Sequence, residues 1–270
     1  MLKAPVSVVI PCFHCSDTLE RAVLSVVGQT LQPKELILVD DASGDGTVAT
    51  ARKLREECGR EWIRILELSS NKGPAAARNV GWEQANEDYV AFLDADDSWH
   101  PRKLEIQYAW MEAHSNVALT GHPCLHVRQS APAPHVTEVS GARPISSRRM
   151  LLSNPFSTPS VMLLRSIPYR FDADQRRSED YFLWLEIVLN GYPAWRLETP
   201  LAYLHKAPFG VSGLSAQLWA MEKGELTTYL KLHRQGLINL FSFSGLALYS
   251  LVKYFNRILI KGKRQKNGRH

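Results

Sequence analysis

The chain has 270 residues and carries 32 lysines and arginines against 27 aspartates and glutamates, a formal net charge of +5. Seven of the basic residues and no acidic residue lie between Lys253 and His270, so the residues before them hold 25 basic against 27 acidic side chains. The body of the protein is therefore close to neutral. This excludes a strongly basic folded domain and argues against nucleic acid as a partner.

The composition is typical of a globular protein. Hydrophobic residues make up 45% and charged residues 22% of the chain, as in one large domain with or without an appendage. The N-terminal apolar run is short and interrupted by Pro5 and Pro11, so we expect no cleaved signal peptide and a cytoplasmic location. The cysteines are too scattered for a disulfide framework, which favours a reducing compartment: Cys12, Cys15, Cys58 and Cys124.

The first hundred residues alternate β-branched runs with stretches of helical periodicity. We expect strands at 6–10, 35–40, 62–68 and 89–93, and helices at 17–27, 47–57 and 74–85. Strands that alternate with helices are typical of βαβ units and predict a mostly parallel sheet covered on both faces. Because such sheets bind ligands at the carboxyl ends of their strands, we examine the residues that follow them, namely Pro11, Asp40, Asn71 and Asp94.

The second half of the chain is less regular. We expect helices at 101–114, 179–190 and 219–234, strands at 117–120 and 160–164, and one or two strands within 194–205. Residues 122–149 show no clear period and predict irregular strands and a loop that could act as a flap. The glycines and serines of 210–215 predict a second segment that could close over a ligand. We expect one domain over 1–215 and a helical extension over 216–270.

Three carboxylates within four residues follow the strand at 89–93, namely Asp94, Asp96 and Asp97. Crowded carboxylates repel one another unless a cation lies among them, and hard oxygen ligands suit Mg²⁺ or Mn²⁺. The alternative is a solvated turn before a helix capped by Ser98. The position at the carboxyl edge of the sheet favours the metal site.

A second acidic turn, Asp40 to Gly46, follows the strand at 35–40. It resembles the opening of an EF-hand loop, but Arg52 stands where the bidentate glutamate would be, so calcium is not expected. We interpret the turn as directing Asp40 at a donor group on a ligand; the alternative is a strand-to-helix turn capped by Asp45 or Thr47. Neither a dinucleotide fingerprint nor a phosphate loop follows any strand, so the phosphates of a bound nucleotide would need a metal or side chains.

Five segments, in this order, resemble the inverting family 2 glycosyltransferases of the GT-A fold: VSVVIPCFHCSDTLERAVLSVVGQT, ELILVDDASGDGT, NKGPAAARNVGWEQA, DYVAFLDADDSWHP and SEDYFLWLEIVLNG. The resemblance spans about Val6 to Ser215 and implies an α/β fold with a Rossmann-like, mostly parallel central sheet. Phe13 and His14 stand where the family usually has an aromatic residue followed by asparagine.

The resemblance also implies a donor site for a nucleotide-sugar, in the first instance a UDP-sugar. Pro11 and Phe13 would flank the nucleobase and Asp40 would accept a hydrogen bond from the uracil imide. The residues implied in donor binding are Pro11, Phe13, Asp40, Asp41, Arg78, Asp94 and Asp96. Those implied as ligands of Mn²⁺ or Mg²⁺ are Asp96, Asp97 and His205. The structural alternatives are a salt bridge for Arg78 and a packing role for His205.

Glu179 and Asp180 begin the helix at 179–190. A carboxylate in a first helical turn often serves only as a partner of the helix dipole. The resemblance implies more: Asp180 would be the general base that takes the proton of the acceptor hydroxyl in a single displacement with inversion. Glu179 is the second candidate and could orient the helix.

The C-terminal stretch predicts a contact with a membrane surface. Residues 236–252 carry no charge but include several polar side chains, and Lys253, Arg257 and Lys261 follow at intervals of four. Such a helix can lie in the headgroup plane of an anionic membrane. The alternatives are packing on the domain or on a partner chain, including a homodimer, and a true membrane span.

Together these features predict a metal-dependent inverting glycosyltransferase that acts on a lipid-linked or polysaccharide acceptor, peripheral to the cytoplasmic face of the inner membrane. Two other functions remain open from the sequence. A nucleotidyltransferase also uses aspartate-held metal on an α/β sheet, and a catalytically silent scaffold subunit would use the acidic segments only as turns. Cys12 and Cys15 form a C-x-x-C pair without a second pair, so a redox or zinc site is disfavoured.

Overall fold

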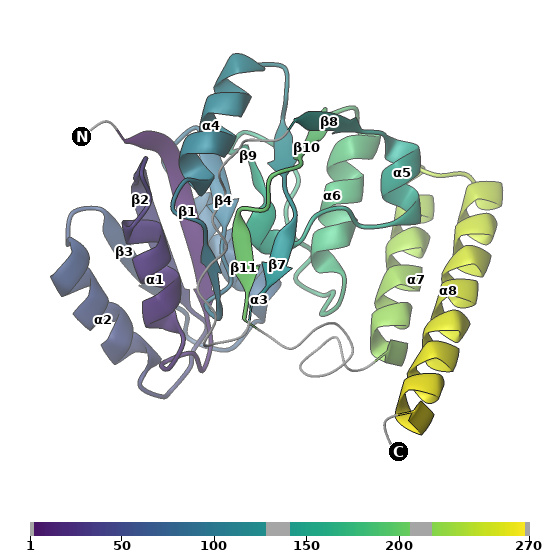
Figure 1. Cartoon of the computed structure of the whole chain (residues 1–270), viewed down its shortest axis with the longest axis horizontal. Helices are drawn as coiled ribbons and strands as arrows, with labels where there is room; N and C mark the ends of the chain where they lie inside the picture. The colour runs from purple at the N-terminus through teal and green to yellow at the C-terminus, as the bar shows by residue number, and fades with distance from the viewer. Residues whose placement is uncertain (1–2, 128–140, 206–217, 268–270) are drawn as a thin grey trace.

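A computed structural model describes residues 3–127, 141–205 and 218–267, with side chains described up to residue 259. It is an α/β structure in which a large twisted sheet lies between layers of helices, and two long helices stand at one edge (Figure 1). Within the described residues, an eight-stranded sheet has the order β3-β2-β1-β4-β9-β6-β10-β8. A three-stranded sheet has the order β5-β11-β7.

The strands of the large sheet are β1 (Ala4–Cys12), β2 (Pro33–Asp40), β3 (Ile63–Glu67), β4 (Tyr89–Phe92), β6 (Leu119–Gly121), β8 (Ala142–Ile145), β9 (Met162–Leu164) and β10 (Ala194–Leu197). Those of the small sheet are β5 (Asp97–Trp99), β7 (Cys124–His126) and β11 (Ala202–Leu204). The helices are α1 (Leu19–Val27), α2 (Thr47–Cys58), α3 (Pro74–Glu83), α4 (Lys103–Ala113), α5 (Ser147–Leu152), α6 (Glu179–Leu189), α7 (Leu218–Arg234) and α8 (Leu240–Asn267), with a short 3₁₀ turn at Thr158–Ser160.

The first four strands are parallel, as the alternating pattern predicts. β1 pairs in parallel with both β2 and β4, and β2 pairs in parallel with β3. Parallel neighbours need crossover connections, which α1, α2 and α3 supply. Beyond β4 the sheet becomes mixed, because β9 runs antiparallel to β4 and β6 while β8 runs antiparallel to β10.

Side chains from both faces of the sheet form two hydrophobic cores. Val8 and Ile10 of β1 belong to the core beneath α1 and α2, whereas Val9 between them belongs to the core beneath α3 and α6. This is the alternation expected of a strand that is covered on both faces. Gly81 of α3 is needed here, since a Cβ at this position would lie 2.3 Å from a methyl group of Val9.

Two local expectations require correction. Ser98 does not cap a helix: it lies in β5, paired with Tyr203 of β11, and α4 begins only at Lys103. The second concerns the segment 122–149, where β7 and β8 fit the expected irregular strands but the helix α5 was not expected. Ser146 caps α5 by accepting a hydrogen bond from the backbone N–H of Arg149.

The C-terminal extension is a helical hairpin beside α6. Helix α8 packs along α7, and Lys253 of α8 forms a 2.5 Å ion pair with Glu225 of α7 (Figure 1). Lys253 therefore faces α7, and not the outer surface that the sequence spacing predicts for it. Among the described residues, no helix combines the length and apolarity needed to traverse a bilayer. The expected domain boundary at 215/216 and the expected closing segment 210–215 lie outside the described residues.

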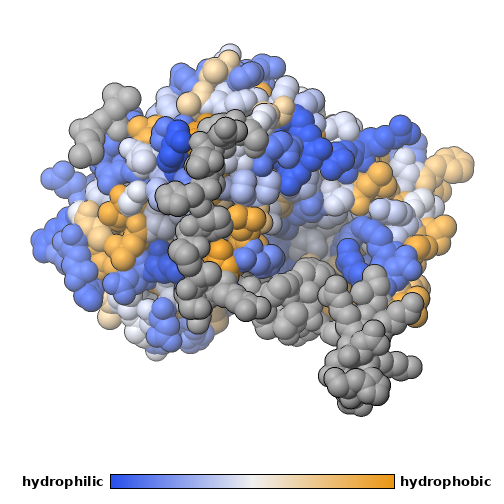
Figure 2. Space-filling view, viewed as in Figure 1, coloured by the Kyte–Doolittle hydropathy of each residue, from blue (hydrophilic) through white to orange (hydrophobic). Residues whose placement is uncertain are grey.

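The outer side of α8 exposes large apolar side chains. They follow one helical stripe, at intervals of three, four or seven residues, and comprise Phe241, Leu248, Val252, Phe255 and Leu259. Figure 2 shows hydrophobic surface at the edge of the molecule where α8 lies. We call these five residues the apolar stripe.

Candidate active site

The aspartate cluster lies where the sequence predicts it, directly after β4 and at the start of β5. Oxygen atoms of Asp94, Asp96 and Asp97 all lie within 4.8 Å of one another. The backbone carbonyl of Asp96 accepts a 2.6 Å hydrogen bond from the guanidinium of Arg21 on α1. Three carboxylates at this separation provide a hard-oxygen site of the kind that Mg²⁺ and Mn²⁺ occupy.

Arg78 connects this cluster to the predicted catalytic helix. Its guanidinium donates to Asp94 at 2.8 Å and to Glu179 at 3.1 Å, and the side chain is buried. Burial by itself lowers the pKa of Arg78, but the charges of Asp94 and Glu179 outweigh it and raise this pKa above its ordinary value. The alternative considered from the sequence, a salt bridge, is present and joins Arg78 to the aspartate cluster, while its part in donor binding stays a prediction.

Asp180 lies in the first turn of α6 beside Glu179. One of its carboxylate oxygens accepts hydrogen bonds of 3.4 Å from the amide of Asn154 and the hydroxyl of Thr158, and the other lies 2.7 Å from the backbone nitrogen of Tyr181. Burial, together with the charge of Glu179, raises the pKa of Asp180 to about 7. A carboxyl group with this pKa is suited to accept a proton near neutral pH.

The residue before this helix has a strained backbone. Ser178 precedes Glu179 with a φ of 57°, in the left-handed region that non-glycine residues seldom adopt. Such strain persists only where the surroundings enforce it, and it is common at functional sites. The turn directs the two carboxylates of α6 toward Arg78 and the segment 154–158.

His205 comes to the aspartate cluster through strand pairing. Leu204 of β11 pairs with Asp97 of β5, and the backbone N–H of His205 donates to the Asp97 carboxylate at 3.3 Å. The Nε2 atom of His205 shares a 2.8 Å hydrogen bond with Ser98. Its buried Nδ1 atom has no hydrogen-bond partner among the residues that the structure describes.

The protonation state of His205 also suits a metal ligand. Burial, with the nearby charge of Arg21, lowers the pKa of His205 despite the opposing charge of Asp96. The imidazole is therefore neutral at pH 7, which is the form that binds a metal. The tight cluster itself contains only the three aspartates, so His205 is a neighbour of that cluster.

Two exposed rings lie at the end of β1, next to the second acidic turn. The ring of Phe13 is 47% exposed and packs edge-on against His14, with 4.2 Å between ring centroids. His14, with a φ of 48°, forms a 3.3 Å ion pair with Asp45 of the acidic turn. Pro11, two residues before Phe13, pairs in register with Val39 of β2. The end of β1 thus presents an exposed aromatic ring, that of Phe13, next to the turn.

The two leading aspartates of the acidic turn are buried and engaged. Asp40 accepts hydrogen bonds from the backbone N–H and the hydroxyl of Ser43, so it shapes the turn. Asp41 accepts hydrogen bonds from the backbone N–H groups of Lys72 and Gly73, at 2.8 and 2.7 Å. Asp41 thereby fixes the loop in front of α3, and its direct contact with a nucleotide stays a prediction.

Sequence reasoning did not identify three groups that the fold brings to the site, namely Arg21, Asn154 and Thr158. Arg21 lies on an ordinary amphipathic helix, and the other two follow the segment that shows no periodicity. No local pattern distinguishes them, because their role depends on long-range packing. The Cys12 and Cys15 thiols are both buried and form no disulfide.

Comparisons with known proteins agree with this geometry. Residues 7–171 match the family described as "Glycosyl transferase family 2". WfgD of Escherichia coli, a UDP-Glc:alpha-D-GlcNAc-diphosphoundecaprenol beta-1,3-glucosyltransferase, is 30% identical over 183 residues, which are 68% of this chain and 69% of WfgD.

Two solved structures share the fold. Staphylococcus aureus TarS 1–349 in complex with UDP-GlcNAc gives a TM-score of 0.70 at 18% identity and covers 93% of this chain and 72% of its own. The mannosyltransferase PcManGT of Pyrobaculum calidifontis, in complex with GDP-Man and Mn²⁺, gives a TM-score of 0.66 at 18% identity. The match covers 92% of this chain and 69% of PcManGT. With the family match over most of the chain and this GT-A architecture, the protein belongs to glycosyltransferase family 2 and is a glycosyl-transfer enzyme.

Proposed function

We propose that this enzyme transfers a sugar from a UDP-sugar to a hydroxyl group of a lipid-linked or polysaccharide acceptor, with inversion at the anomeric carbon. The observation that carries the proposal is the chain of contacts from Asp94 through Arg78 to Glu179, which places the base candidate Asp180 next to the aspartate cluster. The donor class is supported by the UDP-Glc in the name of WfgD and by the UDP-GlcNAc bound to TarS.

The donor nucleotide would lie along the carboxyl edge of β1, β2 and β4. The exposed ring of Phe13 can cover one face of the base, with Pro11 at its side, and Asp40 can accept from the uracil imide by its remaining lone pairs. Asp94 would contact the ribose, and the hydrogen bond from Arg78 holds the Asp94 side chain in place.

The residues present fit a divalent metal. Asp96 and Asp97 offer closely spaced carboxylate oxygens, and the neutral imidazole of His205 lies next to them through its backbone contact with Asp97, with its Nδ1 atom unpartnered among the described residues. A bound Mn²⁺ or Mg²⁺ would neutralise the diphosphate as negative charge develops on the leaving UDP.

Asp180 performs the proton transfer in this mechanism. Its carboxylate accepts the proton of the acceptor hydroxyl while the oxygen attacks the anomeric carbon on the face opposite UDP. Asn154 and Thr158 orient the carboxylate through their hydrogen bonds. Glu179 stays ion-paired to Arg78, so it positions the helix and leaves the proton transfer to Asp180.

The relative WfgD supports a lipid-linked acceptor, and helix α8 supports a location at the membrane surface. WfgD acts on a sugar carried by diphosphoundecaprenol, a membrane lipid. Helix α8 has six lysines and arginines and no acidic residue, and its apolar stripe is exposed. We place the enzyme at the cytoplasmic face of the inner membrane, attached through this helix to anionic lipid.

The test is transfer activity of the wild type and of Asp180→Asn with a panel of UDP-sugars and Mn²⁺. The wild type should release UDP from one donor in a metal-dependent reaction. The Asp180→Asn variant should bind UDP with unchanged affinity and lose transfer by about a thousandfold or more, the upper range for removal of a general base. Release of pyrophosphate from a nucleoside triphosphate, or full activity of Asp180→Asn, would overturn the proposal.

A further inference from the structure

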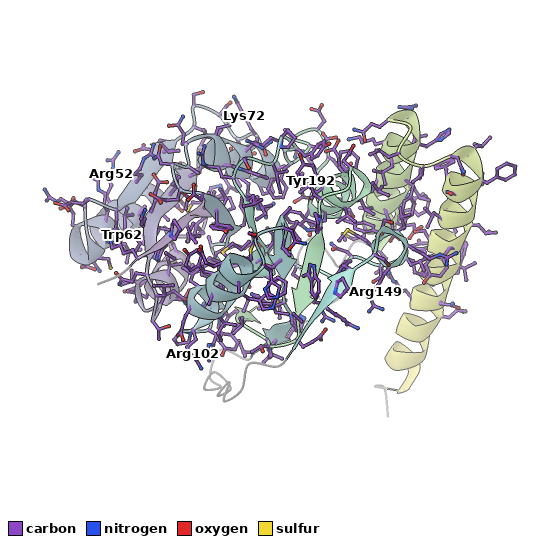
Figure 3. All side chains as sticks on the ribbon, turned by 90° about the horizontal axis from the view of Figure 1, so that it is seen from above. Arg52, Trp62, Lys72, Arg102, Arg149 and Tyr192 are labelled. Carbon is purple, nitrogen blue, oxygen red and sulfur yellow. The ribbon has the colours of Figure 1, made fainter. Side chains whose placement is uncertain are left out.

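A surface groove lies between α5 and α8, outside the site described above. Its volume is about 330 Å³, and most of its lining is apolar. The residues that form it come from the two helices and include Arg148, Leu151, Leu152, Gly245, Leu246 and Tyr249. Figure 3 marks α5 by its residue Arg149, between the sheet and α8.

We propose that this groove binds the isoprenoid diphosphate part of a lipid-linked acceptor, so that the sugar beyond the diphosphate reaches Asp180. The inference rests on the proposed function and adds a binding site for the lipid portion of the acceptor. Three observations carry it: the connection of the groove to the base, the match of its chemistry to the ligand, and the open space at Gly245.

The floor of the groove is tied to the catalytic helix. The hydroxyl of Tyr181, the residue after Asp180, lies 2.7 Å from the carbonyl oxygen of Met150 and 3.0 Å from that of Leu151 on α5. The hydroxyl of Tyr229 on α7 also donates to Leu151, at 3.0 Å. A ligand that seats against α5 is therefore held in a fixed position relative to Asp180.

The chain that leaves α5 leads directly to the base. Helix α5 ends at Leu152, and Asn154 two residues later donates to the Asp180 carboxylate. Thr158 on the same segment makes the second such contact. The segment from the groove to the base is thus short, and a diphosphate at the groove mouth can place its sugar near the proton acceptor.

The chemistry of the lining matches an isoprenoid diphosphate. Leu151, Leu152 and Leu246 provide apolar surface for a branched hydrocarbon chain. The exposed Arg148 offers a planar fork of donors to the phosphate oxygens. Glu225 of α7 is paired with Lys253, so the charge of this carboxylate is offset.

The charge of α8 favours an anionic lipid over a second copy of this chain. The helix carries six basic residues and no acidic residue, so two copies packed along it would repel each other. The groove is also continuous with the apolar stripe, since Gly245 lies between Phe241 and Leu248 on the exposed side of the helix. A long isoprenoid chain can leave the groove along this stripe without entering water.

Gly245 lines the groove and leaves it open. A Cβ built on Gly245 would meet no atom within 4 Å, so a larger side chain fits there without a clash. Replacing glycine inside a helix by leucine also improves helix propensity. The substitution Gly245→Leu therefore fills the groove without disturbing the fold.

The test uses farnesyl diphosphate as a soluble probe and calorimetry on the full chain saturated with UDP and Mn²⁺, so that the donor site is already filled. The wild type should bind farnesyl diphosphate more tightly than inorganic diphosphate. Both Gly245→Leu and Arg148→Glu should weaken farnesyl diphosphate binding by about tenfold, a loss of about 1.4 kcal/mol. The matched control is Ser244→Leu, an exposed neighbour outside the groove, which should bind as the wild type does.

Three results would overturn the inference: equal affinity of wild type and both groove variants, equal affinity for inorganic diphosphate, or equal affinity for a short-chain phosphatidylglycerol, which would indicate a membrane-lipid site. UDP binding by each variant is measured in the same series and reports on folding. If UDP does not bind to the wild type, the proposed function fails while the groove is still tested by the probe alone.

Discussion

Arg78 lies between two carboxylates that are distant in sequence, and its guanidinium donates to Asp94 at 2.8 Å and to Glu179 at 3.1 Å. This buried arginine joins the donor side of the site, at the end of β4, to the acceptor side, at the start of α6. Two negative groups that would otherwise repel each other are thereby held in one arrangement, with Asp180 directly beside them.

Replacing Arg78 by Ala should lower both stability and activity. The change leaves Asp94 and Glu179 without their shared cation, and breaking a buried ion pair in this way lowers the free energy of unfolding by about 3–5 kcal/mol. Urea denaturation measures the effect. The control is Arg52→Ala, which removes an exposed pair with Glu67 and should change the free energy of unfolding by less than about 1 kcal/mol. Equal losses in the two variants would contradict a special role for Arg78.

The pH profile should report the base. Burial and the charge of Glu179 raise the pKa of Asp180 to about 7. Below that pH its carboxyl group is protonated and cannot take the proton from the hydroxyl group of the acceptor substrate. We expect kcat/KM to rise about tenfold per pH unit up to about pH 7 and then to level off. Steady-state rates over a pH series check this. A flat profile between pH 5 and 8 would exclude Asp180 as the titrating base.

The raised pKa of Asp180 also affects the stability of the fold. Whereas kcat/KM should rise with pH, the contribution of Asp180 to the free energy of unfolding should fall. A carboxyl group whose pKa is higher in the folded than in the unfolded state holds its proton longer when folded, so its contribution to stability falls as pH rises. The window extends from the ordinary pKa of aspartate, about 4, up to about 7. Asp180→Asn should remove this dependence, so the gap in unfolding free energy between variant and wild type should grow from pH 4 to pH 7.

Replacing Asp96 by Ala should weaken UDP binding only when Mn²⁺ is present. The side chain belongs to the aspartate cluster, and its loss removes one of the hard-oxygen ligands. We expect the affinity for UDP in the presence of Mn²⁺ to fall about tenfold or more, with no change in the metal-free affinity. Calorimetry with and without Mn²⁺ measures the metal-dependent and the metal-free affinity for UDP separately. Asp174→Ala, at an exposed turn, serves as the control.

Thr158 should affect turnover more than donor binding. Its hydroxyl donates to the Asp180 carboxylate at 3.4 Å, and valine keeps the shape of the side chain while removing that donor. Thr158→Val should lower kcat about tenfold, leave KM for the donor unchanged, and shift the apparent pKa of the base upward. A change in donor KM alone would contradict a positioning role, while rescue by serine would support it.

The apolar stripe of α8 should govern binding to lipid. Leu248 and Phe255 are 66% and 60% exposed, and Leu248→Gln with Phe255→Gln removes apolar area without touching α7. We expect about tenfold weaker sedimentation with vesicles containing phosphatidylglycerol, and no change in metal-dependent UDP-sugar hydrolysis. A parallel loss of hydrolysis would show that the stripe supports the fold and not a membrane contact.

The order of the early elements was accessible from the sequence because each depends on local periodicity. The strands at 6–10 and 35–40 and the helix at 74–85 all occur within a few residues of their predicted bounds. The aspartates after β4 were identified for the same reason, since a strand places the residue that follows it at the carboxyl edge of the sheet.

The irregular region shows where local pattern fails. Helix α5 has only six residues, too few for a periodic signal, and depends on Ser146 as its cap and on Tyr181 and Tyr229 holding its last carbonyl groups. Ser98 has the residue type of a helix cap, but pairing with β11 makes it part of a strand.

The sequence by itself determined the family and the chemical character of the site: an acidic cluster after a strand, a carboxylate pair at a helix start and a basic C-terminal end. The tertiary structure decided which groups meet. Arg78 reaches Glu179 across 101 positions, and Lys253 pairs with Glu225 on a neighbouring helix. Such contacts depend on how whole elements pack, and no spacing within a single element encodes them, because ion pairs and hydrogen bonds act across space irrespective of position in the chain.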